Sequence, residues 1–195
     1  VIGAALALTD EEILSRLDGA LSFMAVPAEE FGEIEFKKQL VSKGKIKYPA
    51  GKPEMIAEGV FDDVDLNVVH HLDLEAPYIG NGTTNGFVSK VITYEGKAAH
   101  AACAPEKGVN ALSAASIGLT ALGLNRETFR DEDHVRVHPI MTEGGSLVNV
   151  VPDKATLETF VRGGNTQAIE DASEKTDRSF IAGAMAMGAK VTIET

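Results

Sequence analysis

The sequence predicts an α/β protein of two parts, an N-terminal α/β part in residues 1–84 and a ferredoxin-like βαββαβ domain in residues 85–195. Three observations lead to this division. Short apolar runs alternate with helical patterns in the first part. The stretch 72–85 is rich in Pro, Gly, Asn and Thr, which is typical of a linker between domains. Beyond it, strand and helix patterns follow one another in the order of a split βαβ unit.

The first part contains several helical patterns. Residues 2–17 have helical periodicity, and a capping-box pattern at residues 9–12 indicates a second helix start within them. The polar, lysine-rich stretch 31–53 predicts an amphipathic helix followed by a loop. A short helix is expected at residues 54–58, where Gly59 ends it.

Two apolar runs in this part, residues 20–26 and 66–69, predict buried strands. Glu29 and Glu30 follow the first run, and His71 follows the second. Open α/β sheets bind ligands beyond their strand ends, and both carboxylate and imidazole are good ligands for a divalent transition metal. Of two adjacent carboxylates, one can bind a metal while the other takes a proton from water. The alternatives are a solvated acidic turn for the Glu pair and an ordinary, partly buried histidine.

The second part has the patterns of four strands and two helices. Strand residues alternate with period two, whereas the helical stretches carry apolar residues on one side. The second helix is expected to start near Asn165 and to end at Gly188, which can adopt the left-handed conformation. In chain order the patterns cover residues 87–94, 110–124, 135–142, 155–162, 165–188 and 190–195.

Three residues of the second part are candidates for a functional site. His100 is flanked by alanines, which leave its ring accessible, and Asn149 follows a Gly144-Gly145 turn. Arg162 closes a strand, and an arginine can bind a carboxylate through two parallel hydrogen bonds. The alternatives are a structural histidine and a surface salt bridge.

The composition excludes several classes of protein. A net charge of -11 argues against nucleic acid as a partner and disfavours an anionic membrane surface. Residues 1–8 are apolar but lack the basic start of a signal peptide, and they are too short to span a bilayer. The single cysteine, Cys103, excludes an intramolecular disulfide framework and fits a reducing compartment, so a cytoplasmic location is expected.

Five motifs in this order resemble the M20 metallopeptidases and amidohydrolases, which include aminoacylases, hippurate hydrolases and p-aminobenzoyl-glutamate hydrolases. The resemblance covers nearly the whole chain. The motifs are Pro27-Ala28-Glu29-Glu30, the stretch 60–65 followed by His71, Gly96-Lys97-Ala98-Ala99-His100-Ala101, Gly144-Gly145 with residues 149–153, and Arg162.

The resemblance implies metal-dependent hydrolysis of an amide bond in an N-acyl or N-aroyl amino acid or a short peptide. Glu29 would be the general base, and Glu30 and His71 would bind metal. Members of the family hold two divalent ions, often zinc, with manganese or cobalt as possible replacements.

The resemblance also implies a homodimer formed through a lid, or dimerisation, domain in residues 85–195. His100 would reach the active site of the second copy and stabilise the oxyanion there. Asn149 and Arg162 would bind the substrate, Arg162 through the substrate carboxylate.

The chain departs from the family in the ligands that it holds. The family's first ligands belong to a His-x-Asp or Cys-Gly-His-Asp segment upstream, and its last ligand follows the lid. We therefore expect a central fragment in which residues 1–84 form a partial metal-binding catalytic domain. Alone it should bind metal weakly or substoichiometrically and be inactive. Two other functions remain open: a non-enzymatic ferredoxin-like dimerisation or ligand-binding module, and an M20 aminopeptidase or dipeptidase.

Overall fold

The computed structural model describes residues 1–29, 32–69 and 84–195. The chain divides into two compact units, Val1–Tyr78 and Ile79–Thr195, each of which is described by itself. The expected linker lies almost entirely outside the described residues, so the domain boundary after residue 84 stays a prediction. No helix in the described part of the chain is long and apolar enough to cross a membrane.

The first unit contains the helices that the sequence predicts. Asp10 caps the second of them, since its carboxylate accepts a hydrogen bond from the backbone N–H of Glu12 at 3.0 Å. The fourth helix begins at Gly51, three residues earlier than expected, and Gly59 follows its end with a φ of 75°. The helices are α1 (Ile2–Leu8), α2 (Glu11–Leu14), α3 (Ile34–Ser42) and α4 (Gly51–Ala57).

The prediction of two strands in this unit is wrong. Residues 20–26 and 66–69 have no strand assignment, and Leu66 and Val68 are 82% and 84% exposed. A strand needs a neighbour that pairs with its backbone N–H and C=O groups. The described part of the unit contains no strand that could serve as this neighbour, so neither apolar run is a buried strand.

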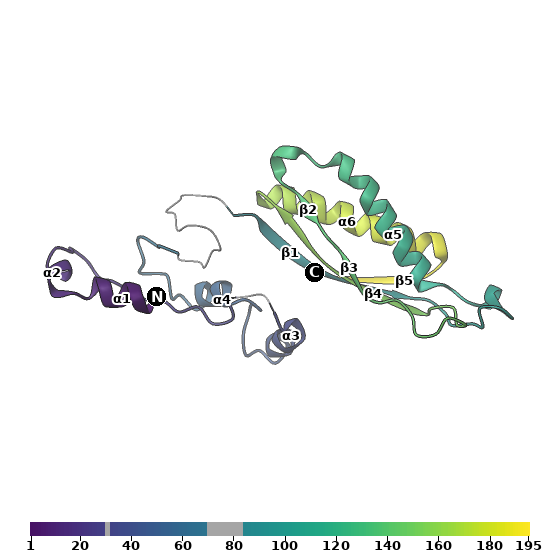
Figure 1. Cartoon of the computed structure of the whole chain (residues 1–195), viewed down its shortest axis with the longest axis horizontal. Coiled ribbons are helices and arrows are strands. Elements are labelled where there is room, and N and C mark those ends of the chain that lie inside the picture. The colour runs from purple at the N-terminus through teal and green to yellow at the C-terminus, as the bar shows by residue number, and fades with distance from the viewer. Residues whose placement is uncertain (30–31, 70–83) are drawn as a thin grey trace. The chain divides into compact units, whose positions relative to one another are not determined.

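The second unit is an antiparallel sheet in the ferredoxin-like order β2-β4-β1-β5, with β3 also paired to β4 (Figure 1). One expected strand, residues 135–142, is divided into β2 and β3. Pro139 lies between them and has no N–H to donate to the ladder, which accounts for the break. The strands are β1 (Gly86–Glu95), β2 (Arg136–Val137), β3 (Ile140–Glu143), β4 (Lys154–Gly163) and β5 (Lys190–Glu194).

Helices α5 (Ala111–Asn125) and α6 (Thr166–Met187) pack side by side on one face of this sheet (Figure 1). Both start where the sequence predicts, because the side chains of Asn110 and Asn165 accept hydrogen bonds from N–H groups of the first turn at 2.9 Å. Gly188 ends α6 with a φ of 67°. Short 3-10 turns cover Pro105–Lys107, Arg126–Thr128 and Asp131–Asp133.

The two helices approach closely at Gly118 and Gly183. A Cβ on Gly183 would collide with the carbonyl oxygen of Ala114, and one on Gly118 would lie 2.6 Å from the Tyr94 hydroxyl. Tyr94 is fully buried and donates a hydrogen bond of 2.8 Å to the carbonyl of Phe180, and burial raises the pKa of its phenol. This contact fixes α6 against both α5 and β1.

A buried charge connects the sheet to α6. Lys90, at the centre of β1, is 1% exposed, and its Nζ lies 2.9 Å from Oδ1 of Asp177 on α6. The same ammonium group donates a hydrogen bond of 2.8 Å to the Thr195 hydroxyl. A buried ammonium group is tolerated only when such partners replace its water shell.

We expect Asp177→Asn to lower the free energy of unfolding by about 2 kcal/mol, because it removes the counter-ion of a buried lysine. The loss should stay below that of a fully buried pair, since the Asp177 side chain is 34% exposed. Urea unfolding followed by circular dichroism measures it. The control is Glu174→Gln on the same helix, which removes an exposed pair with Arg178. Equal stability of the two variants would contradict the prediction.

Candidate functional site

Glu29 lies in a turn that packs against the start of α4. Ala28 adopts a φ of 51°, and a Cβ on Gly51 would collide with the carbonyl oxygen of Pro27, so a glycine there permits the close approach. Oε1 of Glu29 lies 2.9 Å from Nζ of Lys52, and the Glu29 side chain is 38% exposed. Our sequence reasoning missed Lys52, because it is 23 positions away and no local pattern links it to the Glu pair.

The two residues expected to bind metal, Glu30 and His71, lie outside the described residues. Their roles stay predictions. Within residues 1–29, 32–69 and 84–195, no three His, Cys, Asp or Glu side chains come together in a way that could hold a metal ion.

The structure brings His100 and Asn149 together at one end of the second unit. The segments that carry them run antiparallel, with His100 opposite Val150 in an isolated β-bridge. The backbone N–H of Ala101 donates to the carbonyl of Asn149 at 2.9 Å, and the N–H of Val151 donates to the carbonyl of Ala99 at the same distance. Two candidates from distant parts of the sequence are therefore neighbours.

Local hydrogen bonds determine which ring nitrogen of His100 can donate. Its Nδ1 accepts from the backbone N–H groups of Ala102 and Cys103, both at 3.2 Å. In the neutral imidazole the proton must then reside on Nε2. Because the residue is exposed, Nε2–H is available as a donor to a bound molecule. The sequence could not reveal these two N–H groups, since their direction depends on the loop conformation.

Arg162 lies on an aromatic platform at the other end of the sheet. Its guanidinium carbon is 5.1 Å from the ring centre of Phe87 and 5.3 Å from that of Phe160. Phe87 is its direct cross-strand partner, and Phe160 is two residues earlier on the same face of β4. Period-two alternation could have identified Phe160 as a neighbour. The platform limits the directions in which the planar guanidinium can point, which suits recognition of a carboxylate.

One copy of the chain does not bring Arg162 to His100 and Asn149. β4 begins at Lys154, beyond the bridge at Val150, and Arg162 is eight residues further along it. At about 3.3 Å per residue this places Arg162 on the order of 25 Å or more from the His100–Asn149 pair.

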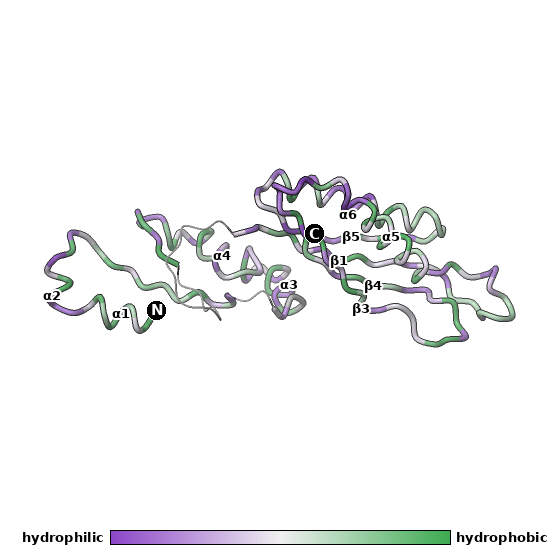
Figure 2. The backbone as a smooth tube through the Cα atoms, turned by 45° about the horizontal axis from the view of Figure 1, so that its top comes forward, coloured by the Kyte–Doolittle hydropathy of each residue, from purple (hydrophilic) through white to green (hydrophobic). Residues whose placement is uncertain are grey.

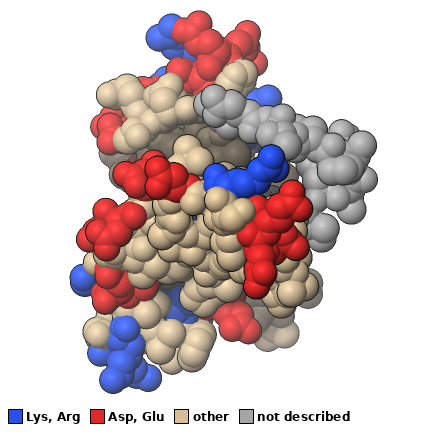
Figure 3. Space-filling view, turned by 90° about the vertical axis from the view of Figure 1, so that its left-hand side faces the viewer, with Lys and Arg blue, Asp and Glu red and all other residues tan. Residues whose placement is uncertain are grey.

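Acidic side chains outnumber basic ones in this chain. Asp and Glu side chains are spread over the face that Figure 3 shows, and the net charge of the chain is -11.

Residues 83–180 match the family model of the M20 peptidase dimerisation domain. The mouse Xaa-Arg dipeptidase is 33% identical over 146 residues, which are 74% of this chain and 33% of that protein. The indole-3-acetyl-aspartic acid hydrolase of Enterobacter agglomerans is 31% identical over 197 residues, 98% of this chain and 41% of the relative. The chain thus spans between a third and two fifths of the length of these relatives.

Among solved structures, the aminobenzoyl-glutamate utilization protein of Klebsiella pneumoniae is similar to this chain, with a TM-score of 0.60 and 29% sequence identity. The match covers 74% of this chain and 37% of that one.

Proposed function

The chain belongs to the M20 peptidase family, and on this premise we propose that the full-length protein hydrolyses an amide bond in an N-acyl or N-aroyl amino acid or a short peptide. The observation that carries the proposal is the ring of His100, which two backbone N–H groups hold with Nε2–H as the exposed donor. A donor fixed in this way suits the negative charge that develops on an amide oxygen during hydrolysis.

Glu29 is the proposed general base. Its carboxylate takes a proton from the attacking water and later gives that proton to the leaving amine, so the residue ends the cycle unchanged. The same carboxylate lies 2.9 Å from Nζ of Lys52. Glu30 and His71 would be among the ligands of a divalent metal, which would supply polarisation of the amide carbonyl.

The two ends of the second unit serve different active sites in this proposal. His100 and Asn149 act in the site of a second copy, where Nε2–H donates to the oxyanion. Arg162 binds the substrate carboxylate in another site. The separation between Arg162 and the His100–Asn149 pair supports this division, because one small substrate cannot contact both ends of β4.

We propose that the copies associate through the outer face of α5 and the open edge of β3. All 15 residues of α5 are uncharged, which is unusual for a helix with an exposed face, and Ile117 and Leu124 are 37% and 72% exposed. Figure 2 shows the pale to green colouring of this helix. The Ser116 and Thr120 hydroxyls donate hydrogen bonds to backbone carbonyls of their own helix. Their protons are therefore already used and add little polar character to this face.

The neighbouring edge has the same apolar character. On β3, Ile140 and Met141 are 53% and 37% exposed, and the strand pairs with β4 alone among the described strands. An open edge of this kind is a template for another strand. A second copy can cover both the helix and the strand about a two-fold axis.

The double variant Ile117→Lys, Leu124→Lys in the full-length protein should weaken self-association about 100-fold or more, because two ammonium groups would have to be desolvated in each copy. Sedimentation equilibrium measures the dissociation constant. The matched control is Met185→Lys on α6, a 78% exposed side chain that is not part of α5 or β3. If the control weakened the dimer as much as the double variant did, α5 would not be the interface.

The hydrolysis itself is tested on the full-length protein with zinc, manganese or cobalt supplied. The assay compares N-acetyl and N-benzoyl amino acids with dipeptides that carry a free amino group. Cleavage of the acylated compounds supports the proposal. The similarity to the mouse Xaa-Arg dipeptidase favours a second candidate, a dipeptidase, which would cleave only the free-amine compounds. Dimerisation without any cleavage would favour a non-enzymatic module.

A cytoplasmic location is part of the proposal, based on the single cysteine.

A further inference from the structure

Two arginines of the second unit face each other across neighbouring strands. The ladder between β2 and β4 pairs Arg136 directly with Arg162, and Val137 with Val161. The two valines are 3% and 0% exposed and belong to the core, whereas both arginines are exposed. Successive side chains of a strand point to opposite faces of a sheet. The arginines therefore lie on the face that α5 and α6 do not cover (Figure 1).

No built-in anion compensates this pair of like charges. Directly opposed side chains start from Cβ atoms about 4.5–5.5 Å apart, where like charges repel each other. Within the described residues neither guanidinium group forms an ion pair. The acidic turn Asp131–Asp133 precedes β2, but its described ion pair joins Glu132 to Arg130. Glu158 is the next carboxylate on the same face of β4, four positions or about 13 Å from the arginine of that strand.

The two guanidinium groups retain hydrogen-bond donors for a ligand. Arg162 lies over the ring of Phe87 on β1, which is the neighbour of β4 on the side away from β2. Arg136 donates one hydrogen bond of 2.7 Å to the carbonyl of Val135. In the described part of the chain no other hydrogen bond from either guanidinium group occurs. Because a guanidinium group has five N–H donors, most of them are available on both side chains.

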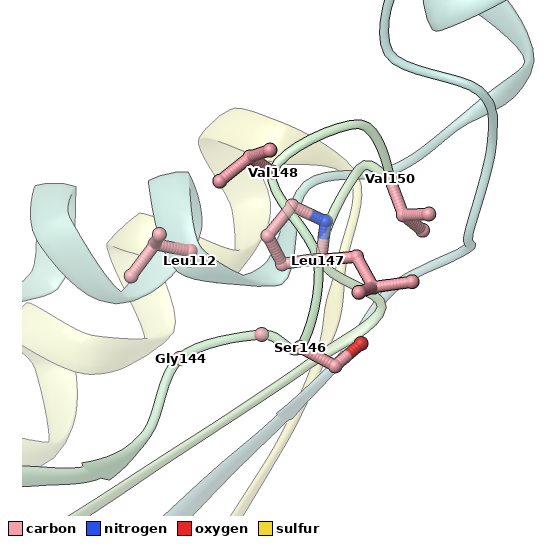
Figure 4. Close-up of a pocket in the computed structure, with 8 residues that line it drawn as sticks. Leu112, Gly144, Ser146, Leu147, Val148 and Val150 are labelled. Carbon is pink, nitrogen blue, oxygen red and sulfur yellow. The ribbon is translucent and has the colours of Figure 1, made fainter.

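The opposite end of the unit provides no counter-ion for a carboxylate. Figure 4 shows the loop that follows β3 and leads to Val150, the β-bridge partner of His100. None of the side chains that line this loop is charged, and the Ser146 hydroxyl is the polar one among them. A carboxylate that leaves water without a charged or hydrogen-bonding partner is strongly disfavoured. A second acidic group of a substrate would therefore be bound at the arginine end of the sheet.

We propose that Arg136 is a specificity-determining residue that binds a second carboxylate of the substrate beside Arg162. The amino acid released by hydrolysis is then a dicarboxylic one, with one acidic group on each arginine. Opposed arginines can reach both acidic groups of one small molecule, and such charge-assisted hydrogen bonds are strong. The dianion also removes the repulsion between the arginines, whereas a neutral side chain leaves it in place. The inference rests on the proposed function, because it takes Arg162 as the residue that binds the substrate carboxylate.

The test compares N-acetyl-L-glutamate with N-acetyl-L-glutamine as substrates of the full-length protein, because the two differ in one charge at nearly equal size. The wild type should have the higher kcat/KM for the glutamate derivative. Arg136→Gln should reduce this preference about 10-fold or more, since a hydrogen bond between two charged groups is lost. Arg136→Lys should keep part of the preference, because it retains the positive charge. The control is Arg178→Gln on α6, a 63% exposed side chain, and it should leave the preference unchanged.

Three results would overturn the inference. The first is a wild type that favours the glutamine derivative, or one that cleaves other N-acyl amino acids but neither of these two. The second is an Arg136→Gln variant that keeps the full preference. The third is an equal loss on both substrates, which would make the role of Arg136 structural.

Binding of the two compounds to the wild type and to Arg136→Gln, measured by calorimetry, gives a readout without turnover. If the wild type cleaves no N-acyl amino acid, the proposed function fails, and the arginine pair is judged by this binding alone. Tighter binding of the glutamate derivative that the variant reduces would support the pair. Absence of binding, or a preference that the variant does not reduce, would refute it.

Discussion

Glu29→Gln in the full-length protein should lower kcat by about 10²–10⁴-fold while metal remains bound, because glutamine cannot take the proton from the attacking water. The amide is close in size to the carboxylate and leaves the turn against α4 intact. Metal content by plasma emission spectrometry and turnover of one N-acyl amino acid give the two measurements. Loss of metal together with activity would assign Glu29 to metal binding instead of proton transfer.

The matched control is Glu58→Gln in the same unit. Glu58 also pairs with a lysine, Lys47, at 3.7 Å, and its side chain is 60% exposed. Its replacement should leave kcat unchanged, because Glu58 has no proposed role in the reaction. The fold should also be unaffected, because an exposed ion pair contributes little to its stability. A Glu29→Gln enzyme as active as this control would remove Glu29 from the catalytic role.

The fold of the second unit could be predicted from the sequence for two reasons. The signals that mark its helix ends are local, and the strands of its sheet find their pairing partners within the unit. Asn110, Asn165 and Gly188 mark helix ends through hydrogen bonds or backbone angles within a few residues. Strand β1 pairs with β4 on one side and with β5 on the other, all inside residues 86–194. Period-two and helical patterns therefore gave the correct βαββαβ order.

The first unit could not be predicted equally well, because strand formation is not a local property. Residues 20–26 have the apolar composition of a strand, yet ladder hydrogen bonds require a neighbour that composition does not reveal. For the same reason the sequence pointed to Glu29 but not to Lys52, which meets it only through the packing of Pro27 on Gly51. The proton position on His100 likewise depends on the loop that follows it.

A mixed dimer of two inactive variants should regain activity if His100 acts in the site of the second copy. One full-length chain would carry Glu29→Gln and the other His100→Ala, which removes the oxyanion donor and should itself cost about 10²–10³-fold in kcat. In the mixed dimer, the site with an intact Glu29 receives His100 from the other chain. That site is complete, whereas the second site lacks both groups.

The expected recovery follows from subunit statistics. With random pairing half of the dimers are mixed, and each has one complete site of two, so activity should reach about a quarter of the wild-type value. Co-expression with two different affinity tags isolates the mixed dimers, which should then reach about half. If His100 acted in its own chain, each site would lack one group and no activity would return. This outcome would contradict the division of roles between His100 and Arg162, because both would then have to reach one site from opposite ends of β4.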